Sequence, residues 1–212
     1  MRTRTILSVL PHTLMKYHSY TAEFFGTFLL ALIVRLAVSS SLPVATPVIA
    51  GMTLGLLVYA VGTVSGAHVN PAVTIGLAIV RKIKPKDAVI YVALQCLGGV
   101  IAGFVGTALL GGSVVNFDAG TSIMPAFFEA IGAFILVLGV SSVVFQKALA
   151  PVSGLTIGTA LALGALTASV GSAGIVNPAV ALALNAYSPL YLLGPIVGGI
   201  ISALGYKALT KA

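Results

Sequence analysis

The sequence predicts an all-α membrane protein with six transmembrane helices, two re-entrant half-helices and an inverted internal repeat. The first observation is composition, because 58% of the 212 residues are hydrophobic and only 7% are charged. Soluble domains are about one quarter charged, so lipid is the solvent for most of this chain. The second and third observations are six long apolar runs and a set of motifs that occurs twice. This composition excludes a soluble enzyme, a disordered chain and a free nucleic-acid-binding protein.

Six apolar runs, bounded by proline, glycine and charged residues, supply the predicted spans, since a crossing helix needs about 20 apolar residues. These runs cover residues 20–40, 47–64, 88–110, 125–145, 152–170 and 189–207. Two shorter runs, 70–80 and 177–186, have about half the length of a crossing helix. We expect a single transmembrane domain over residues 20–208, with repeat halves at about 20–110 and 125–208, after a tail of residues 1–19.

The basic residues predict the orientation of the chain in the membrane. Ten of the 11 fall on one side when they are assigned to the gaps between spans: Arg2, Arg4, Lys16, Arg81, Lys82, Lys84, Lys86, Lys147, Lys207 and Lys211. Because cytoplasmic loops are rich in Lys and Arg, we expect both termini to be cytoplasmic. The expected location of this multi-pass protein is the plasma membrane. Arg35, the exception, lies near the outer end of the first span, where a long side chain is expected to snorkel. The net charge of +7 is thus explained by topology, and nucleic acid is not an expected partner.

The two halves of the chain repeat the same motifs in the same order. The paired segments are 22–28 (AEFFGTF) with 128–134 (FEAIGAF), 51–55 (GMTLG) with 154–158 (GLTIG), and 70–73 with 177–180 (both NPAV). The lone Glu and the Asn of each half are 47 residues apart in the first half and 48 in the second. With three spans per half, the second half must enter the membrane from the opposite side. Sites in such inverted repeats lie near the midplane between discontinuous helices, so we expect Asn70 near Asn177.

Both short runs begin with the same tripeptide: Asn70-Pro71-Ala72 and Asn177-Pro178-Ala179. One copy is an ordinary helix start, because Asn is a good N-cap and Pro suits the first helical position. Two copies at equivalent places in an inverted repeat indicate a functional site. Each Asn oxygen would cap its half-helix and leave amide hydrogens to donate into a pore. Two facing helix N-termini, each with about half a positive charge, would favour a neutral solute and oppose cations.

Glu23 and Glu129 are carboxylates inside apolar spans. We expect each to accept hydrogen bonds from the loop before a half-helix, since non-helical backbone at membrane depth needs partners. The alternative is a proton relay, although the spans contain no further acidic residue to continue one. His68 has no His or Cys at ligand spacing, which favours a packed loop residue over a metal ligand. No metal site, cofactor or enzyme active site is predicted.

These motifs resemble the aquaporin and glycerol-facilitator family, the major intrinsic proteins. The resemblance extends from residue 22 to the C-terminus and depends on residues 22–28, on SGAHVNPAVT at 65–74, on NPA at 177–179 and on Glu129. It implies a homotetramer with one pore per subunit that passes water or small neutral solutes and excludes protons. It also implies that backbone carbonyls on either side of the asparagines line the pore: those of Gly66, Ala67, His68, Ala173, Gly174 and Ile175.

The outer constriction departs from the family pattern. An Arg normally follows the second Asn-Pro-Ala, whereas this chain has Val180. By the family's spacings, the other three constriction positions are Ala50, Ala165 and Gly174. Water-selective members have an aromatic residue, a His and the Arg at these places, and glycerol facilitators keep aromatics and the Arg. Without the Arg, the constriction lacks a fixed positive charge and its hydrogen-bond donors, which indicates a wide, less polar mouth.

The leading hypothesis is therefore a passive channel for water, larger neutral solutes or dissolved gases. A first alternative is a facilitator for polyols, urea, ammonia or gases with little water flow. A second is an ion-coupled secondary transporter, because inverted repeats are also typical of that class. A third is a non-conducting membrane scaffold.

Overall fold

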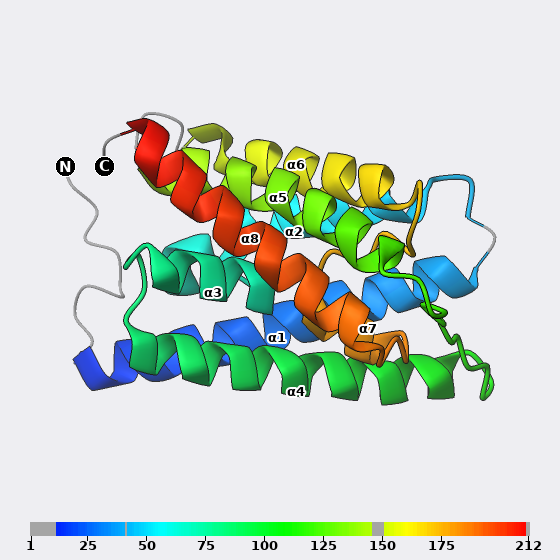
Figure 1. Ribbon diagram of the computed structural model, residues 1–212. Coiled ribbons are helices and arrows are strands. Elements are labelled where there is room, and N and C mark those ends of the chain that lie inside the picture. The colour runs from blue at the N-terminus through cyan, green and yellow to red at the C-terminus, as the bar shows by residue number, and fades with distance from the viewer. Residues whose placement is uncertain (1–11, 41, 146–150, 211–212) are drawn as a thin grey trace.

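The computed structural model describes residues 12–40, 42–145 and 151–210. Within these residues the chain forms eight helices and no strands, arranged as one elongated bundle (Figure 1). The helices are α1 (His12–Ser39), α2 (Thr46–Ser65), α3 (Pro71–Ile79), α4 (Pro85–Leu109), α5 (Met124–Phe145), α6 (Ser153–Ala168), α7 (Pro178–Ala183) and α8 (Pro189–Thr210). The all-helical fold class is confirmed, with six long helices and two short ones.

Five of the long helices have the length and apolar composition to cross a membrane; these are α1 from residue 16 onward, α2, α4, α5 and α8. The sixth, α6, is apolar but has only 16 residues, and a short 3₁₀ segment at residues 151–152 precedes it. Helix α1 begins at His12, eight residues before the predicted span. Residues 1–11 of the predicted tail lie outside the described residues, as do Lys147 and Lys211.

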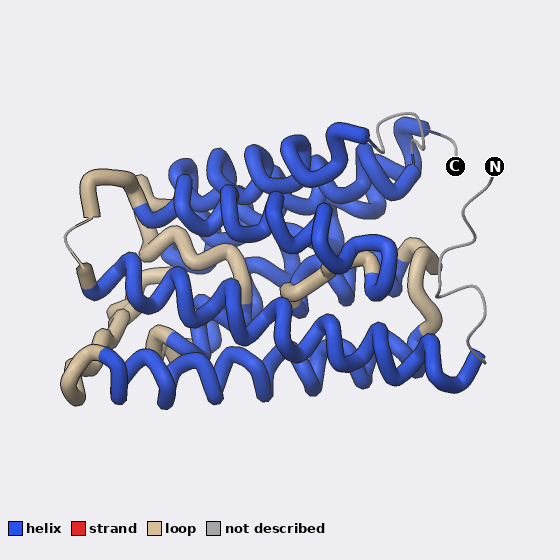
Figure 2. The backbone as a smooth tube through the Cα atoms, turned by 180° about the vertical axis from the view of Figure 1, so that it is seen from behind, coloured by secondary structure: helices blue, strands red, loops and turns tan. Residues whose placement is uncertain are grey.

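The two half-helices begin in the middle of the bundle and run toward opposite ends of it (Figure 1). Helix α3 has nine residues and α7 has six, shorter than the run 177–186 from which α7 was predicted. The loops that lead into them pass through the centre of the bundle, as the tube view shows (Figure 2). This is the arrangement that an inverted repeat predicts.

One end of the bundle carries most of the positive charge. Helix α1 begins there, α8 ends there, and the turn between α3 and α4 lies at the same end (Figure 1). The described basic residues of that end are Lys16, Arg81, Lys82, Lys84, Lys86 and Lys207. We call it the basic end, and the opposite end the outer end.

Glycines four residues apart in one helix, such as Gly51 and Gly55 of α2, set how closely the helices approach. A Cβ on Gly55 of α2 would lie 2.9 Å from the carbonyl oxygen of Gly154 on α6, and a Cβ on Gly158 of α6 would lie 2.5 Å from that of Gly51. In α4, Gly99 packs on the backbone of Ala179 in the half-helix α7. These contacts allow the half-helices to be held between long helices with little space for side chains.

Gly198→Ala is expected to lower the unfolding temperature by several degrees. A Cβ at Gly198 of α8 would collide with the carbonyl oxygen of Ala130 on α5, and overpacking costs about 1–3 kcal/mol. Gly205→Ala on the same helix is the matched control, since nothing lies within 4 Å of a Cβ there. Alanine at that position should be neutral or stabilising by up to about 1 kcal/mol. Thermal unfolding of both variants in detergent tests this, and equal midpoints would contradict it.

Candidate functional site

The two asparagines bring the half-helices together at the centre of the bundle. Each is the N-cap of its half-helix: the Oδ1 of Asn70 accepts from the backbone N–H of Ala72 at 2.8 Å, and that of Asn177 from Ala179 at 3.0 Å. Both side chains are almost fully buried, at 3% and 2% exposed. The cap geometry follows from the local sequence, because Pro at the first helical position leaves the next N–H free to bond the Asn oxygen.

Each asparagine also bonds the opposite loop. The Nδ2 of Asn70 donates to the carbonyl oxygen of Val176 at 3.1 Å, and the Nδ2 of Asn177 donates to that of Val69 at 3.0 Å. One of the two amide hydrogens of each Asn is therefore used to join the repeat halves. The sequence predicted two amide hydrogens free for a solute, whereas this arrangement leaves one per Asn.

Val69 and Val176, the residues before the two asparagines, have left-handed backbone conformations. Their φ angles are +40° and +59°, a region that β-branched residues rarely occupy. Such a conformation costs about 1–3 kcal/mol and persists only where the surroundings enforce it. Here the carbonyl of each valine accepts from an Asn, and its N–H donates to a buried carboxylate.

Glu23 supplies the carboxylate for the first loop. Its Oε1 accepts from the Ser65 hydroxyl at 2.6 Å and from the backbone N–H of His68 at 2.9 Å. Its Oε2 accepts from the N–H of Val69 at 2.7 Å and from the Gln95 amide at 2.8 Å. The side chain is fully buried, so four donors surround the carboxylate where water does not reach it.

Glu129 makes three of the four corresponding contacts in the second half, without a counterpart of the Gln95 amide among the described residues. It accepts from the Ser172 hydroxyl at 2.7 Å and from the N–H groups of Ile175 and Val176 at 2.9 Å and 2.5 Å. Sequence reasoning missed Gln95 and both serines. The serines could have been found as a further repeat match, because each stands five residues before the Asn of its half.

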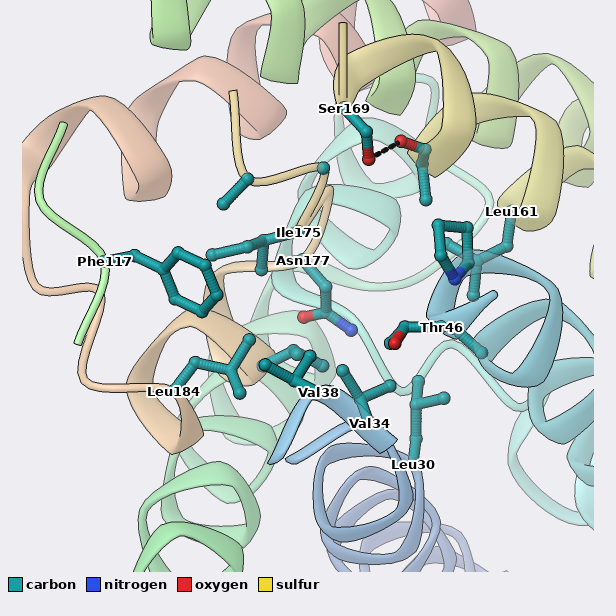
Figure 3. A pocket seen from close by; sticks show the side chains of 16 residues that line it. Leu30, Val34, Val38, Thr46, Phe117, Leu161, Ser169, Ile175, Asn177 and Leu184 are labelled. Atoms are coloured by element: carbon teal, nitrogen blue, oxygen red, sulfur yellow. Dashed lines mark hydrogen bonds between the residues drawn. The ribbon is translucent and has the colours of Figure 1, made fainter. Parts of the chain in front are cut away.

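A cavity of about 270 Å³ lies at the outer end and is called the outer cavity here (Figure 3). It brings together the four predicted constriction positions, Ala50, Ala165, Gly174 and Val180, together with Asn177. Ala173 and Ile175 also line it. The rest of the wall is mostly apolar, with Thr46 and Ser169 as further polar residues beside Asn177; its apolar members are Leu30, Val34, Val38, Pro47, Phe117, Leu161 and Leu184. Gly174 is required at its position, since φ is +65° and a Cβ would lie 2.6 Å from the Ala165 carbonyl oxygen.

A second cavity, of about 320 Å³, lies at the basic end and is called the inner cavity. Gly66, Ala67 and His68 line it, as does Val73, which corresponds to Val180 in the repeat. The residues of the two predicted triplets therefore line different cavities: Gly66, Ala67 and His68 line the inner cavity, and Ala173, Gly174 and Ile175 line the outer cavity.

His68 packs within the protein. Its Nδ1 lies 3.2 Å from the Thr74 hydroxyl, and its ring meets the Tyr91 ring edge-on at a centroid distance of 5.3 Å. Among the described residues there is no group of three or more His, Cys, Asp or Glu side chains that could hold a metal ion.

The prediction that Arg35 snorkels to the membrane surface is wrong. Its side chain is fully buried between α1, α4 and α7. It donates to the carbonyl oxygen of Ala183 and to the hydroxyl of Thr107, each at 2.7 Å, and to the carbonyl oxygen of Ser113 at 3.2 Å. The sequence could not show that the last turn of a half-helix would place acceptor carbonyls beside this residue.

Two half-helices that meet between cavities, inside an inverted repeat of apolar helices, define an integral, multi-pass membrane protein of the channel type. The comparisons with known proteins identify the family. The profile of the major intrinsic protein family matches residues 11–206, and the chain belongs to this family. Its members are membrane channels for water or small neutral solutes.

Relatives and a solved structure agree with this assignment. The chain is 31% identical to Aquaporin AqpM of Methanothermobacter marburgensis over 183 residues, which cover 76% of this chain and 74% of the relative. It is 34% identical to Aquaporin NIP3-1 of Zea mays over 207 residues, covering 89% and 68% respectively. Its fold is similar to that of the aquaglyceroporin from Plasmodium falciparum, with a TM-score of 0.71, 20% identity, and coverage of 92% of this chain and 97% of the other.

Proposed function

We propose that this protein is a passive channel of broad tolerance, which passes water and larger neutral solutes through a wide, apolar outer constriction. The observation that carries the proposal is the lining of the outer cavity, where Ala50, Ala165, Gly174 and Val180 converge above Asn177. None of these four residues supplies a charge or an aromatic ring. A pore selects by its diameter and by the hydrogen-bonding groups along it, so this constriction should select weakly.

The paired asparagines would supply the polar step midway through the pore. Each retains one amide hydrogen, which could donate to a solute oxygen at the point where the two half-helix N-termini meet. The partial positive charge of those termini opposes cations and leaves neutral solutes unaffected. In this proposal, cation and proton exclusion depends on the midplane instead of an outer Arg.

The proposal includes a homotetramer with one pore per subunit, in the plasma membrane with the basic end cytoplasmic. The positive charge at the basic end supports that orientation, because cytoplasmic segments are enriched in Lys and Arg. The hydrogen bonds of Glu23 and Glu129 favour a loop-supporting role over a proton relay, since each carboxylate already accepts from two backbone N–H groups of the loop before a half-helix.

The proposal is tested by measuring the permeability of reconstituted vesicles to water, glycerol, urea and protons in parallel. We expect flux of water and of at least one larger neutral solute, without proton leak. A pore tight to everything larger than water would contradict the wide constriction. Solute flux with little water flow would support a facilitator, and saturable flux that needs an ion gradient would support a coupled transporter. No permeability in folded tetramer would support a scaffold.

Val180→Arg is expected to reduce the flux of glycerol and urea about tenfold while reducing water flux much less, because the constriction becomes narrower and positively charged. Val180 is 3% exposed and lines the outer cavity, so a longer side chain there projects into the mouth or repacks its wall. Val180→Leu is the control for bulk without charge. Stopped-flow swelling and shrinking of vesicles measures both fluxes. Equal reductions for water and the larger solutes would mean that position 180 does not line the constriction.

A further inference from the structure

One aromatic side chain, that of Phe117, lines the outer cavity, and it is not one of the four constriction positions. Phe117 belongs to the loop between α4 and α5, and its partly buried ring lines the cavity. Figure 3 shows the ring entering from one side, with Thr46 and Leu161 on the other side and the Asn177 amide between them. The ring is the largest side chain in the lining.

The loop that carries Phe117 is held by two hydrogen bonds shortly before that residue. The Nη2 of Arg35 donates to the carbonyl oxygen of Ser113 at 3.2 Å. The Nδ2 of Asn185, just beyond the end of α7, donates to the carbonyl oxygen of Val115 at 3.0 Å. Both bonds connect the loop to the region of α7, the half-helix whose Val180 lines the same cavity.

Arg35 is placed to connect the loop with the half-helix directly. Its Nη1 donates to Ala183, the last residue of α7, while its Nη2 reaches the loop and Thr107 of α4. The C-terminus of a helix carries partial negative charge, which favours a buried cation there. Among the described residues no carboxylate pairs with Arg35. Gly106 makes room for the side chain, since a Cβ there would lie 2.6 Å from the Arg35 Cδ.

A buried charge of this kind is costly in a membrane protein and marks a functional position more often than a packing one. A purely structural link between α1 and α7 would need only the bond to Ala183. The additional bond to Ser113 fixes a loop of irregular backbone that has few other bonds to the bundle among the described residues.

We propose that Phe117 is the side chain that limits solute size at the outer mouth, and that Arg35 is the positioning residue that holds its loop there. This inference depends on the proposed channel function and deepens it. The four constriction positions leave the mouth wide, and the Phe117 ring narrows it from the loop side with an apolar surface. Selection at the mouth is then by size, without a fixed charge or an added hydrogen-bond donor.

The first test replaces Phe117 and measures urea, glycerol and water permeability of vesicles with equal amounts of folded protein. Phe117→Ala is expected to raise the ratio of urea and glycerol to water permeability about threefold or more, with Phe117→Leu in between. Val114→Ala is the matched control, because Val114 is on the same loop but 57% exposed and outside the cavity lining. An unchanged ratio in both Phe117 variants would overturn the proposal.

The second test examines Arg35 through its dependence on Phe117. Arg35→Lys keeps the charge but cannot form the three bonds of the guanidinium group. The ratio of urea and glycerol permeability to water permeability should therefore rise, as is expected for Phe117→Ala. In the Phe117→Ala background, Arg35→Lys should change the ratio no further. A structural role alone would lower the folded yield and leave the ratio per folded channel unchanged, which would overturn the positioning role. Wild-type protein without any flux would instead contradict the channel function itself.

Discussion

Glu23→Ala is expected to prevent the channel from folding stably. The substitution removes the acceptor of four hydrogen bonds, from Ser65, Gln95 and the N–H groups of His68 and Val69. Each buried donor left without a partner costs about 1–3 kcal/mol, so the loss should be about 4 kcal/mol or more. It should be larger still because the strained φ of Val69 would no longer be enforced. The measurement is the yield and unfolding temperature of the detergent-solubilised protein.

Two further variants separate this loss from a general effect of removing a carboxylate. Glu129→Ala should also destabilise the protein, since it removes the acceptor of three bonds. Asp118→Ala should have little effect, because Asp118 is exposed and accepts one bond, from the N–H of Gly120. If all three variants were equally stable, loop support by the buried carboxylates would be refuted.

Glu23→Gln distinguishes loop support from a proton relay. In the wild-type protein these donors face a carboxylate oxygen, and in the variant some of them would face the NH₂ group of the glutamine. We therefore expect lower stability, with normal flux through the channels that fold. If the variant were as stable as the wild type but had lost a transport activity that depends on an ion gradient, the coupled transporter would be favoured instead.

The half-helices and their pairing could be predicted because their signals are local and repeated. Asn followed by Pro determines where each half-helix begins, and the equal Glu-to-Asn spacing indicates that the two starts are equivalent. An odd number of spans per half then places the starts face to face. The bonds from Asn70 to Val176 and from Asn177 to Val69 give this pairing its atomic form.

The surroundings of the site could not be predicted, because they depend on which helices meet. Gln95 is an isolated polar residue in an apolar run, and only the packing of α1 against α4 brings it to Glu23. Arg35 has the position of a snorkelling residue until α7 covers it. Phe117 lies in a loop without helical periodicity, so its direction follows from bonds to distant residues. The local sequence contains none of this information.

Asn70→Asp and Asn177→Asp are each expected to raise cation leak about tenfold by placing a negative charge where two half-helix N-termini supply about one positive charge in total. The cap should survive, since a carboxylate oxygen can accept from the N–H of Ala72 or Ala179 as the amide oxygen does. The hydrogen bond from the Asn side chain to the opposite loop, called the cross-link here, should be lost. A carboxylate cannot donate to the carbonyl oxygen of Val176 or Val69. Sodium and proton flux into vesicles measures the leak.

The lost cross-link is separated from the added charge by Asn70→Ser and Asn177→Ser. Serine can still cap the half-helix with its hydroxyl oxygen, but it cannot reach across to the opposite loop and adds no charge. If the midplane is the cation barrier, the Asp variants leak cations and the Ser variants leak far less, although both lose the same cross-link. Equal leak in Asp and Ser variants would show that the cross-link, by keeping the pore narrow, excludes ions. No leak in either set of variants would mean that the cation barrier lies elsewhere in the pore. Another group would then have to exclude cations in place of the Arg that position 180 lacks.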